Sequence, residues 1–150
     1  MAEIYSMTQG HNFWNETLSL AEKCSWRAGP KLAEKMKNND FNQWERVFAA
    51  RVDGKAAGFC TLAKRDELPS RYEYTPFIGF IFVDEQYRGQ RLSEKMIKSA
   101  ASYANALGYE KVYILSGEIG LYEKYGFTKL GDYETTYGSI DRLFVKSTLV

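Results

Sequence analysis

Hydrophobic residues recur at two kinds of spacing along the chain, and each kind predicts a different element. Steps of three and four predict helices over residues 13–24, 32–36 and 92–107. Alternating or unbroken apolar runs predict strands instead. These runs occupy residues 44–52, 56–63, 77–83, 112–115, 127–130 and 140–145. The pattern therefore predicts an α/β fold.

Turn residues indicate how these elements are joined. Asp53-Gly54 lies between the first two predicted strands and favours a hairpin, because glycine tolerates positive φ. Residues 77–83 carry no polar side chain, which is typical of a strand covered on both faces at the centre of a sheet. That strand, the helix ended by Gly108 and the next strand form a βαβ unit. A short helix is predicted over 119–125, and a break at Gly29-Pro30 separates the first two helices.

Composition and charge narrow the class of protein. A chain of 150 residues with 45% hydrophobic positions predicts one domain spanning 1–150. A net charge of +1 supplies no overall field for an anionic polymer or surface, so we expect no nucleic-acid or membrane partner. Residues 1–5 lack the basic start and apolar stretch of a secretory signal, and we expect a cytoplasmic protein.

Cysteine and histidine content argues against two kinds of chemistry. Cys24 and Cys60 are isolated and show no CxxC spacing, so neither a disulfide framework nor a metal site is predicted. The single histidine, His11, precedes the first predicted helix in a polar stretch. Mechanisms that use a serine or cysteine nucleophile require an imidazole beside it, and they are not supported.

A polar, basic turn at residues 84–93 leads into the long predicted helix. Helix N-termini present free N–H groups and a positive dipole end, which suit a phosphate group. Arg88 and Arg91 would add charge-assisted bonds, and Gly89 would let the backbone approach closely. The alternative is an ordinary solvated helix start with basic residues. Neither a Walker lysine pattern nor GxGxxG is present.

Two segments resemble motifs of the GNAT superfamily of N-acyltransferases. Residues 81–93, IFVDEQYRGQRLS, resemble its acyl-CoA-binding motif, and residues 121–127, LYEKYGF, resemble its second signature. The order of elements over residues 12–145 also fits. The resemblance implies the GNAT fold, a mixed central β-sheet with a βαβ acyl-CoA-binding core and flanking helices. It further implies an N-acetyltransferase that moves the acetyl group of acetyl-CoA to a primary amine by direct attack.

The resemblance also assigns the donor site. Backbone groups of Ile81, Phe82 and Val83 would bind the pantetheine arm like an added strand. The pyrophosphate would be cradled by the turn, namely by Arg88, Gly89, Gln90, Arg91, Leu92 and Ser93. This chain departs from the family pattern Arg-Gly-x-Gly-x-Gly, because Arg91 and Ser93 replace the two later glycines. The family's asparagine before the second signature has no clear counterpart either.

Acetyl transfer needs a stabilised oxyanion, a proton donor for the thiolate and a deprotonated amine. The resemblance places the oxyanion donor at the backbone N–H of Phe82 or Val83. It makes Tyr122 the catalytic acid, because a phenol of pKa about 10 is protonated at neutral pH. The alternative is that Tyr122 packs in the core. Glu73 is the candidate base and Glu118 the second candidate, unless the amine arrives neutral and needs none.

The acceptor is not identified by the sequence. In this family the acceptor site is usually built from the first two helices and the late hairpin, here Trp26, Arg27 and a turn over 132–137. Asp132 and Glu134 beside Tyr133 and Tyr137 would suit a cationic amine, with a solvated loop as the alternative.

Several alternatives stay open. Small-molecule and peptide amines both stay open as the acceptor, and a homodimer stays open as the oligomeric state. A non-catalytic acyl-CoA-binding sensor or regulatory module is the alternative function. The replaced glycines favour the sensor, whereas the retained Tyr122 favours turnover.

Overall fold

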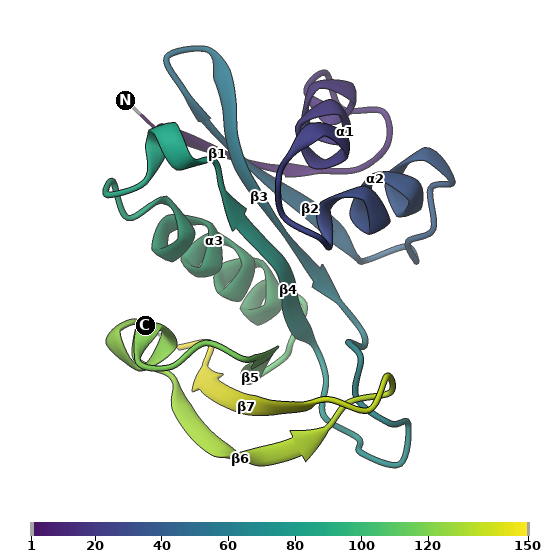
Figure 1. Ribbon diagram of the computed structural model, residues 1–150, viewed down its shortest axis with the longest axis vertical. Coiled ribbons are helices and arrows are strands. Elements are labelled where there is room, and N and C mark those ends of the chain that lie inside the picture. The colour runs from purple at the N-terminus through teal and green to yellow at the C-terminus, as the bar shows by residue number, and fades with distance from the viewer. Residues whose placement is uncertain (1, 150) are drawn as a thin grey trace. The chain divides into compact units, whose positions relative to one another are not determined.

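The computed structural model describes residues 2–149, which form one seven-stranded sheet and the helices beside it (Figure 1). Strands follow the order β1-β2-β3-β4-β5-β7-β6. The pairs β1–β2, β2–β3, β5–β7 and β6–β7 are antiparallel, whereas β4 and β5 are parallel. The predicted α/β class, the mixed sheet and the central place of β4 are therefore confirmed.

The elements have the following bounds. The strands are β1 Ala2–Met7, β2 Arg46–Val52, β3 Lys55–Ala63, β4 Phe77–Val83, β5 Lys111–Ser116, β6 Thr128–Glu134 and β7 Ile140–Ser147. The helices are α1 Trp14–Lys23, α2 Gly29–Lys37, α3 Leu92–Ala106 and α4 Leu121–Lys124, with a 3₁₀ turn η1 at Glu85–Tyr87.

The chain divides into two compact units. The first comprises the chain as far as Leu62 together with Phe80–Ala100. The second comprises Ala63–Gly79 together with the chain from Ala101 onward. The boundaries fall inside β4 and inside α3. The prediction of one domain over residues 1–150 stays a prediction.

In the first unit, α1 and α2 cover one face of the sheet formed by β1, β2 and β3 (Figure 1). The turn between β2 and β3 has Asp53 at φ 51° and Gly54 at φ 80°. Two successive positive φ values are typical of the type I′ turn, so the predicted hairpin is confirmed. The core between helices and sheet contains Met7, Trp14, Ala21, Leu32, Ala33, Met36, Val47, Ala49, Phe59 and Phe82.

Two features of this unit differ from the sequence expectation. Strand β1 was not predicted, because it is an edge strand in which only Met7 is fully buried among the described residues. Gly29 and Pro30 do not break the chain ahead of α2 but form its first turn. Proline suits that position because its missing N–H would have no partner there. A Cβ on Gly29 would lie 2.3 Å from Cys24 Sγ, so glycine allows α1 and α2 to approach closely.

In the second unit, β5 lies between the first residues of β4 and strand β7, with the register Phe77↔Tyr113. The predicted βαβ unit is confirmed by this parallel pairing. Strand β6 continues to Glu134, beyond the predicted end at residue 130. The ladder with β7 extends it, with Asp132 opposite Arg142. The expected turn over 132–137 is therefore wrong, because its first residues belong to a strand.

Candidate functional site

The backbone of β4 is irregular at Phe80, which has φ 48° within the strand. A bulky residue in this left-handed region is uncommon and costs about 1–3 kcal/mol. Such a residue interrupts the regular course of a strand in the way a bulge does. Among residues 2–149, β4 pairs with β5 at a single register position, Phe77↔Tyr113. The residues of β4 that follow Phe80 are therefore not part of that ladder.

Close packing against β3 defines the other side of β4. A Cβ on Gly58 would lie 2.6 Å from the carbonyl oxygen of Phe82 and 3.3 Å from the Cα of Val83. The N–H of Asp84 donates to the carbonyl of Ala57 at 2.8 Å, just past the end of the strand. Glycine in β3 thus permits an approach of the two backbones that no side chain would allow.

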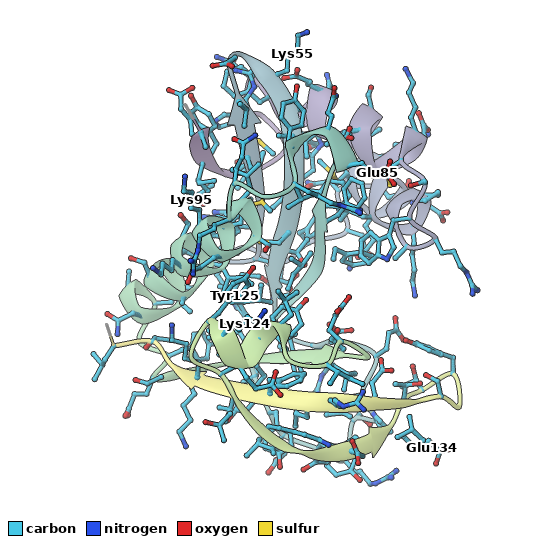
Figure 2. The ribbon with its side chains drawn as sticks, turned by 60° about the vertical axis from the view of Figure 1, so that its left-hand side comes forward. Lys55, Glu85, Lys95, Lys124, Tyr125 and Glu134 are labelled. Carbon is cyan, nitrogen blue, oxygen red and sulfur yellow. The ribbon has the colours of Figure 1, made fainter. Side chains whose placement is uncertain are left out.

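The segment after β4 forms a tight, polar turn before α3, with Glu85 on η1 and Lys95 on α3 (Figure 2). Asp84 begins it, since its Oδ1 accepts from the N–H of Gln86 at 3.4 Å. Arg88 Nε donates to the carbonyl of Val83 at 3.2 Å. This bond joins the turn back to the last residue of β4, so Arg88 braces the segment.

The turn has left-handed backbone at two positions, with φ 87° at Gly89 and φ 58° at Arg91. Arg91 therefore adopts the conformation of a glycine although it carries a side chain. Its Nε donates to Glu94 Oε1 at 2.6 Å, and its side chain is 69% exposed. The backbone geometry of the turn is thus kept where the sequence departs from the expected glycine.

The predicted donor residues lie in one continuous stretch of the first unit. Ile81, Phe82 and Val83 end β4, and the rest occupy the turn and the first turn of α3. Leu92 is buried and anchors the helix start. The exposed residues of the turn are Arg88, Gly89, Gln90 and Arg91, whereas Ser93 is half-buried. Their roles as ligands stay predictions.

An aromatic group forms beside β4, and sequence reasoning found only part of it. The Trp26 ring is nearly parallel to that of Phe82, at 8° with 6.0 Å between centroids. Phe59 stacks on Phe82 at 5.2 Å, and Phe80 meets Trp26 edge-on at 6.4 Å. The sequence analysis proposed Trp26 for the acceptor site. Its contacts with residues of β3 and β4 could not be predicted, because these residues are distant in the sequence.

Tyr122 lies on α4 and is 5% exposed. Its ring contacts Phe144 at 5.5 Å and both Phe127 and Tyr125 at 6.3 Å between centroids. The packing interpretation is therefore correct for the ring, and the catalytic role of the hydroxyl stays a prediction.

The two candidate bases lie in loops of the second unit. Glu73 is exposed in the segment between β3 and β4. Glu118 is exposed after β5, where its N–H donates to Ser116 Oγ at 3.1 Å. Neither position decides which of them acts as a base.

The residues expected to recognise a cation are divided between the two faces of β6. Asp132 Oδ1 binds Lys129 Nζ at 2.9 Å, and this hydrogen bond lowers the pKa of Asp132. Successive residues of a strand point to opposite faces, so Tyr133 is directed away from Asp132 and from Glu134. Glu134 lies at the end of β6 (Figure 2). Tyr133 instead bonds the hydroxyl of Tyr74 at 3.2 Å. The strand therefore separates Tyr133 from the two acids, whereas Asp132 and Glu134 share one face of β6.

Among residues 2–149, no group of three or more His, Cys, Asp or Glu side chains is arranged to hold a metal ion. None of the helices in that range combines the length and the apolar character that crossing a bilayer requires.

Known proteins resemble this chain along its whole length. The model of the acetyltransferase (GNAT) family matches residues 12–127. An aminoglycoside 6′-acetyltransferase type Ii superposes with a TM-score of 0.74 at 15% identity, covering 99% of this chain and 98% of that one. An aminoglycoside 6′-N-acetyltransferase complexed with coenzyme A gives 0.72 at 13% identity, with 99% and 98% covered.

A third solved structure, a GNAT family acetyltransferase from Elizabethkingia anophelis with acetyl-CoA bound, gives a TM-score of 0.66 at 18% identity and covers 97% of each chain. A search of curated proteins found no match. At these identities the structural likeness shows the fold alone, and the expected fold is confirmed.

Proposed function

The chain belongs to the GNAT acetyltransferase family, and we propose that it is an N-acetyltransferase that moves the acetyl group of acetyl-CoA directly to a primary amine. The observation that carries this proposal is the backbone of the turn after β4. Gly89 and Arg91 both adopt left-handed φ, and a left-handed backbone where the family pattern has glycine supports a phosphate-binding turn. Two of the similar structures were obtained with coenzyme A or acetyl-CoA, which supports the same donor here.

The donor would lie along residues of the first unit. The pyrophosphate would accept hydrogen bonds from N–H groups of the turn and of the start of α3, where the helix dipole favours an anion. Arg88 is assigned a bracing role through Val83, whereas the exposed Arg91 would share its guanidinium between Glu94 and a phosphate. The pantetheine arm would pair with the backbone of β4 after the irregular Phe80.

The proposed chemistry gives each candidate residue one role. The amine nitrogen attacks the thioester carbonyl carbon, and the N–H of Phe82 or Val83 stabilises the oxyanion. Collapse of the intermediate breaks the carbon–sulfur bond, and Tyr122 donates a proton to the departing thiolate. Glu73 accepts the proton that the amine loses, and solvent returns a proton to the phenolate. The products are an amide and free coenzyme A.

Calorimetric titration with acetyl-CoA tests the donor site. We expect saturable binding that weakens in Arg88→Ala and with coenzyme A lacking its 3′-phosphate. Arg65→Ala is the matched control, because Arg65 is an exposed arginine of the other unit. Absence of acetyl-CoA binding would contradict the proposal.

A free-thiol assay with a panel of amines tests turnover. In Tyr122→Phe the ring keeps its packing, so we expect a fall in kcat of about 10²-fold or more without loss of folding. Tyr125→Phe, the neighbouring tyrosine on the same helix end, is the control and should retain activity. Equal rates in the two variants would contradict the role of Tyr122 as acid.

The second candidate function is a non-catalytic acyl-CoA-binding sensor, which the replacement of two glycines by Arg91 and Ser93 favours. Tight binding of acetyl-CoA with no transfer to any amine would establish the sensor instead. We further propose a cytoplasmic enzyme whose acceptor is a small molecule or a peptide amine.

A further inference from the structure

Trp26 is held rigidly in the connection between α1 and α2. Its carbonyl accepts the N–H of Gly29 at 3.0 Å and the Cys24 thiol at 3.7 Å. Cys24 N–H in turn donates to Leu20, so the connection is joined to the end of α1. The indole ring is half-buried and parallel to Phe82, leaving part of its surface exposed. This geometry makes Trp26 a preformed apolar platform.

The platform contacts the residue that is assigned to the reacting carbonyl. Phe82, whose ring stacks on Trp26, carries one of the two N–H groups proposed for the oxyanion. Phe80, at the irregular point of β4, meets the same indole edge-on. An acceptor that brings its nitrogen to the thioester would therefore bring its neighbouring atoms toward Trp26. An apolar group on the acceptor would be favoured there, because it removes exposed aromatic surface from water.

The stretch of chain that carries this platform is positively charged. Residues 23–31 contain Lys23, Arg27 and Lys31 and no acidic residue. Glu22, the residue before this stretch, is already bound by Lys37 on α2. Arg27 directly follows Trp26 and is exposed, and within residues 2–149 no carboxylate binds it. An exposed guanidinium that follows the aromatic platform in the chain suits a carboxylate, whereas the three cations of this stretch would repel a polycationic acceptor.

We infer that the acceptor is an α-amino acid with a large apolar side chain, and this inference rests on the proposed N-acetyltransferase function. Arg27 binds the carboxylate, Trp26 contacts the apolar side chain, and the α-amino group attacks the thioester. The amino group loses a proton and gains the acetyl group, giving an N-acetylamino acid and free coenzyme A. Aminoglycosides, which carry several amines and no carboxylate, are poor acceptors in this arrangement.

Acetylation rates of matched amines test the inference. L-Phenylalanine and phenethylamine differ only in the carboxylate, and L-alanine lacks the large side chain. We expect kcat/KM for phenylalanine to exceed that of each of the other two about tenfold or more, since a charge-assisted hydrogen bond has an effect of this size. Kanamycin should be slower still. Equal rates with phenylalanine and phenethylamine, or a preference for kanamycin, would overturn the inference.

Two variants separate the contributions. Arg27→Ala should bring the ratio of phenylalanine to phenethylamine rates close to one, with Arg27→Lys intermediate. Trp26→Ala should bring the ratio of phenylalanine to alanine rates close to one, and Trp26→Phe should retain part of it. Acetyl-CoA affinity measured on each variant confirms that the donor site is intact. Ratios that do not change in these variants would contradict the assigned roles.

A binding measurement distinguishes this inference from the proposed function. Phenylalanine and phenethylamine are titrated calorimetrically into the protein saturated with coenzyme A. If no amine is acetylated but phenylalanine binds at least tenfold more tightly, the inferred ligand class holds and only the catalytic proposal fails. If the two amines bind equally, the inference fails whatever the turnover.

Discussion

Replacement of Gly58 by alanine tests the arrangement of β3 and β4 on which the donor site depends. Gly58 is buried in β3, opposite Ala50 of β2. A Cβ at this position would lie 2.6 Å from the carbonyl oxygen of Phe82. Ordinary contact begins at 3.4 Å, so the backbone of β4 would have to move by about 0.8 Å. The clashing atom belongs to the backbone, so rotation of a side chain cannot relieve the contact.

The size of the effect follows from two opposing contributions. Overpacking of this kind costs about 1–3 kcal/mol. Replacing a glycine in a strand offsets about 0.5–1 kcal/mol of that cost, because the unfolded chain loses conformational entropy. We therefore expect a net loss of about 1–2 kcal/mol in the free energy of unfolding. For a chain of this length that corresponds to a fall in Tm of about 2–8 °C.

Urea unfolding followed by tryptophan fluorescence measures the loss. Gly10→Ala is the matched control, because it lies in the same unit, does not have positive φ and would place its Cβ within 4 Å of nothing. Acetyl-CoA affinity should also fall in Gly58→Ala, since the displaced residues of β4 are those proposed to bind the pantetheine. Equal stability of the two variants would refute the close approach of β3 and β4.

Three further predictions concern titration, thiol reactivity and backbone strain. The hydrogen bond with Tyr74 and burial raise the pKa of Tyr133 from 10 to about 12, so stability that is present below pH 10 is lost as the pH rises toward 12. Tyr133→Phe should lose less stability over that interval in urea unfolding, and an unchanged slope would contradict this. Burial raises the pKa of the Cys60 thiol, so the native protein should expose only the half-buried Cys24 to Ellman's reagent, with both thiols reacting in urea. Arg91→Gly should relieve the backbone strain at φ 58°, whereas Arg91→Ala keeps it, so the glycine variant should have the higher Tm. A higher Tm for the alanine variant would show that the backbone is unstrained there.

Much of the fold could be predicted from the sequence, because the responsible signals act within short segments. The unbroken apolar run at Phe77–Val83 predicted β4 with the bounds that the structure shows. Asp53-Gly54 predicted the hairpin through the φ values that it tolerates. The periodicity before Gly108 predicted α3 for the same reason, since one helix face carries its own apolar spacing.

The candidate donor segment could be named from the sequence because its members are consecutive in the chain, and its role stays a prediction. What the sequence did not show is how the turn keeps its shape with Arg91 in place of glycine. That depends on a left-handed backbone and on the bond from Arg91 to Glu94. The bond from Arg88 to the carbonyl of Val83 likewise has no signal in the sequence.

By itself, then, the sequence determined the periodic elements, their turns and the order of the two motifs, because each depends on residues close together in the chain. Only the tertiary structure decided that β1 completes an edge of the sheet, that β6 carries Asp132 and Tyr133 to opposite faces, and that Trp26 lies on Phe82. The physical reason is that pairing and packing join residues far apart in sequence. Their free energy depends on surfaces that meet only after folding, which no local spacing records.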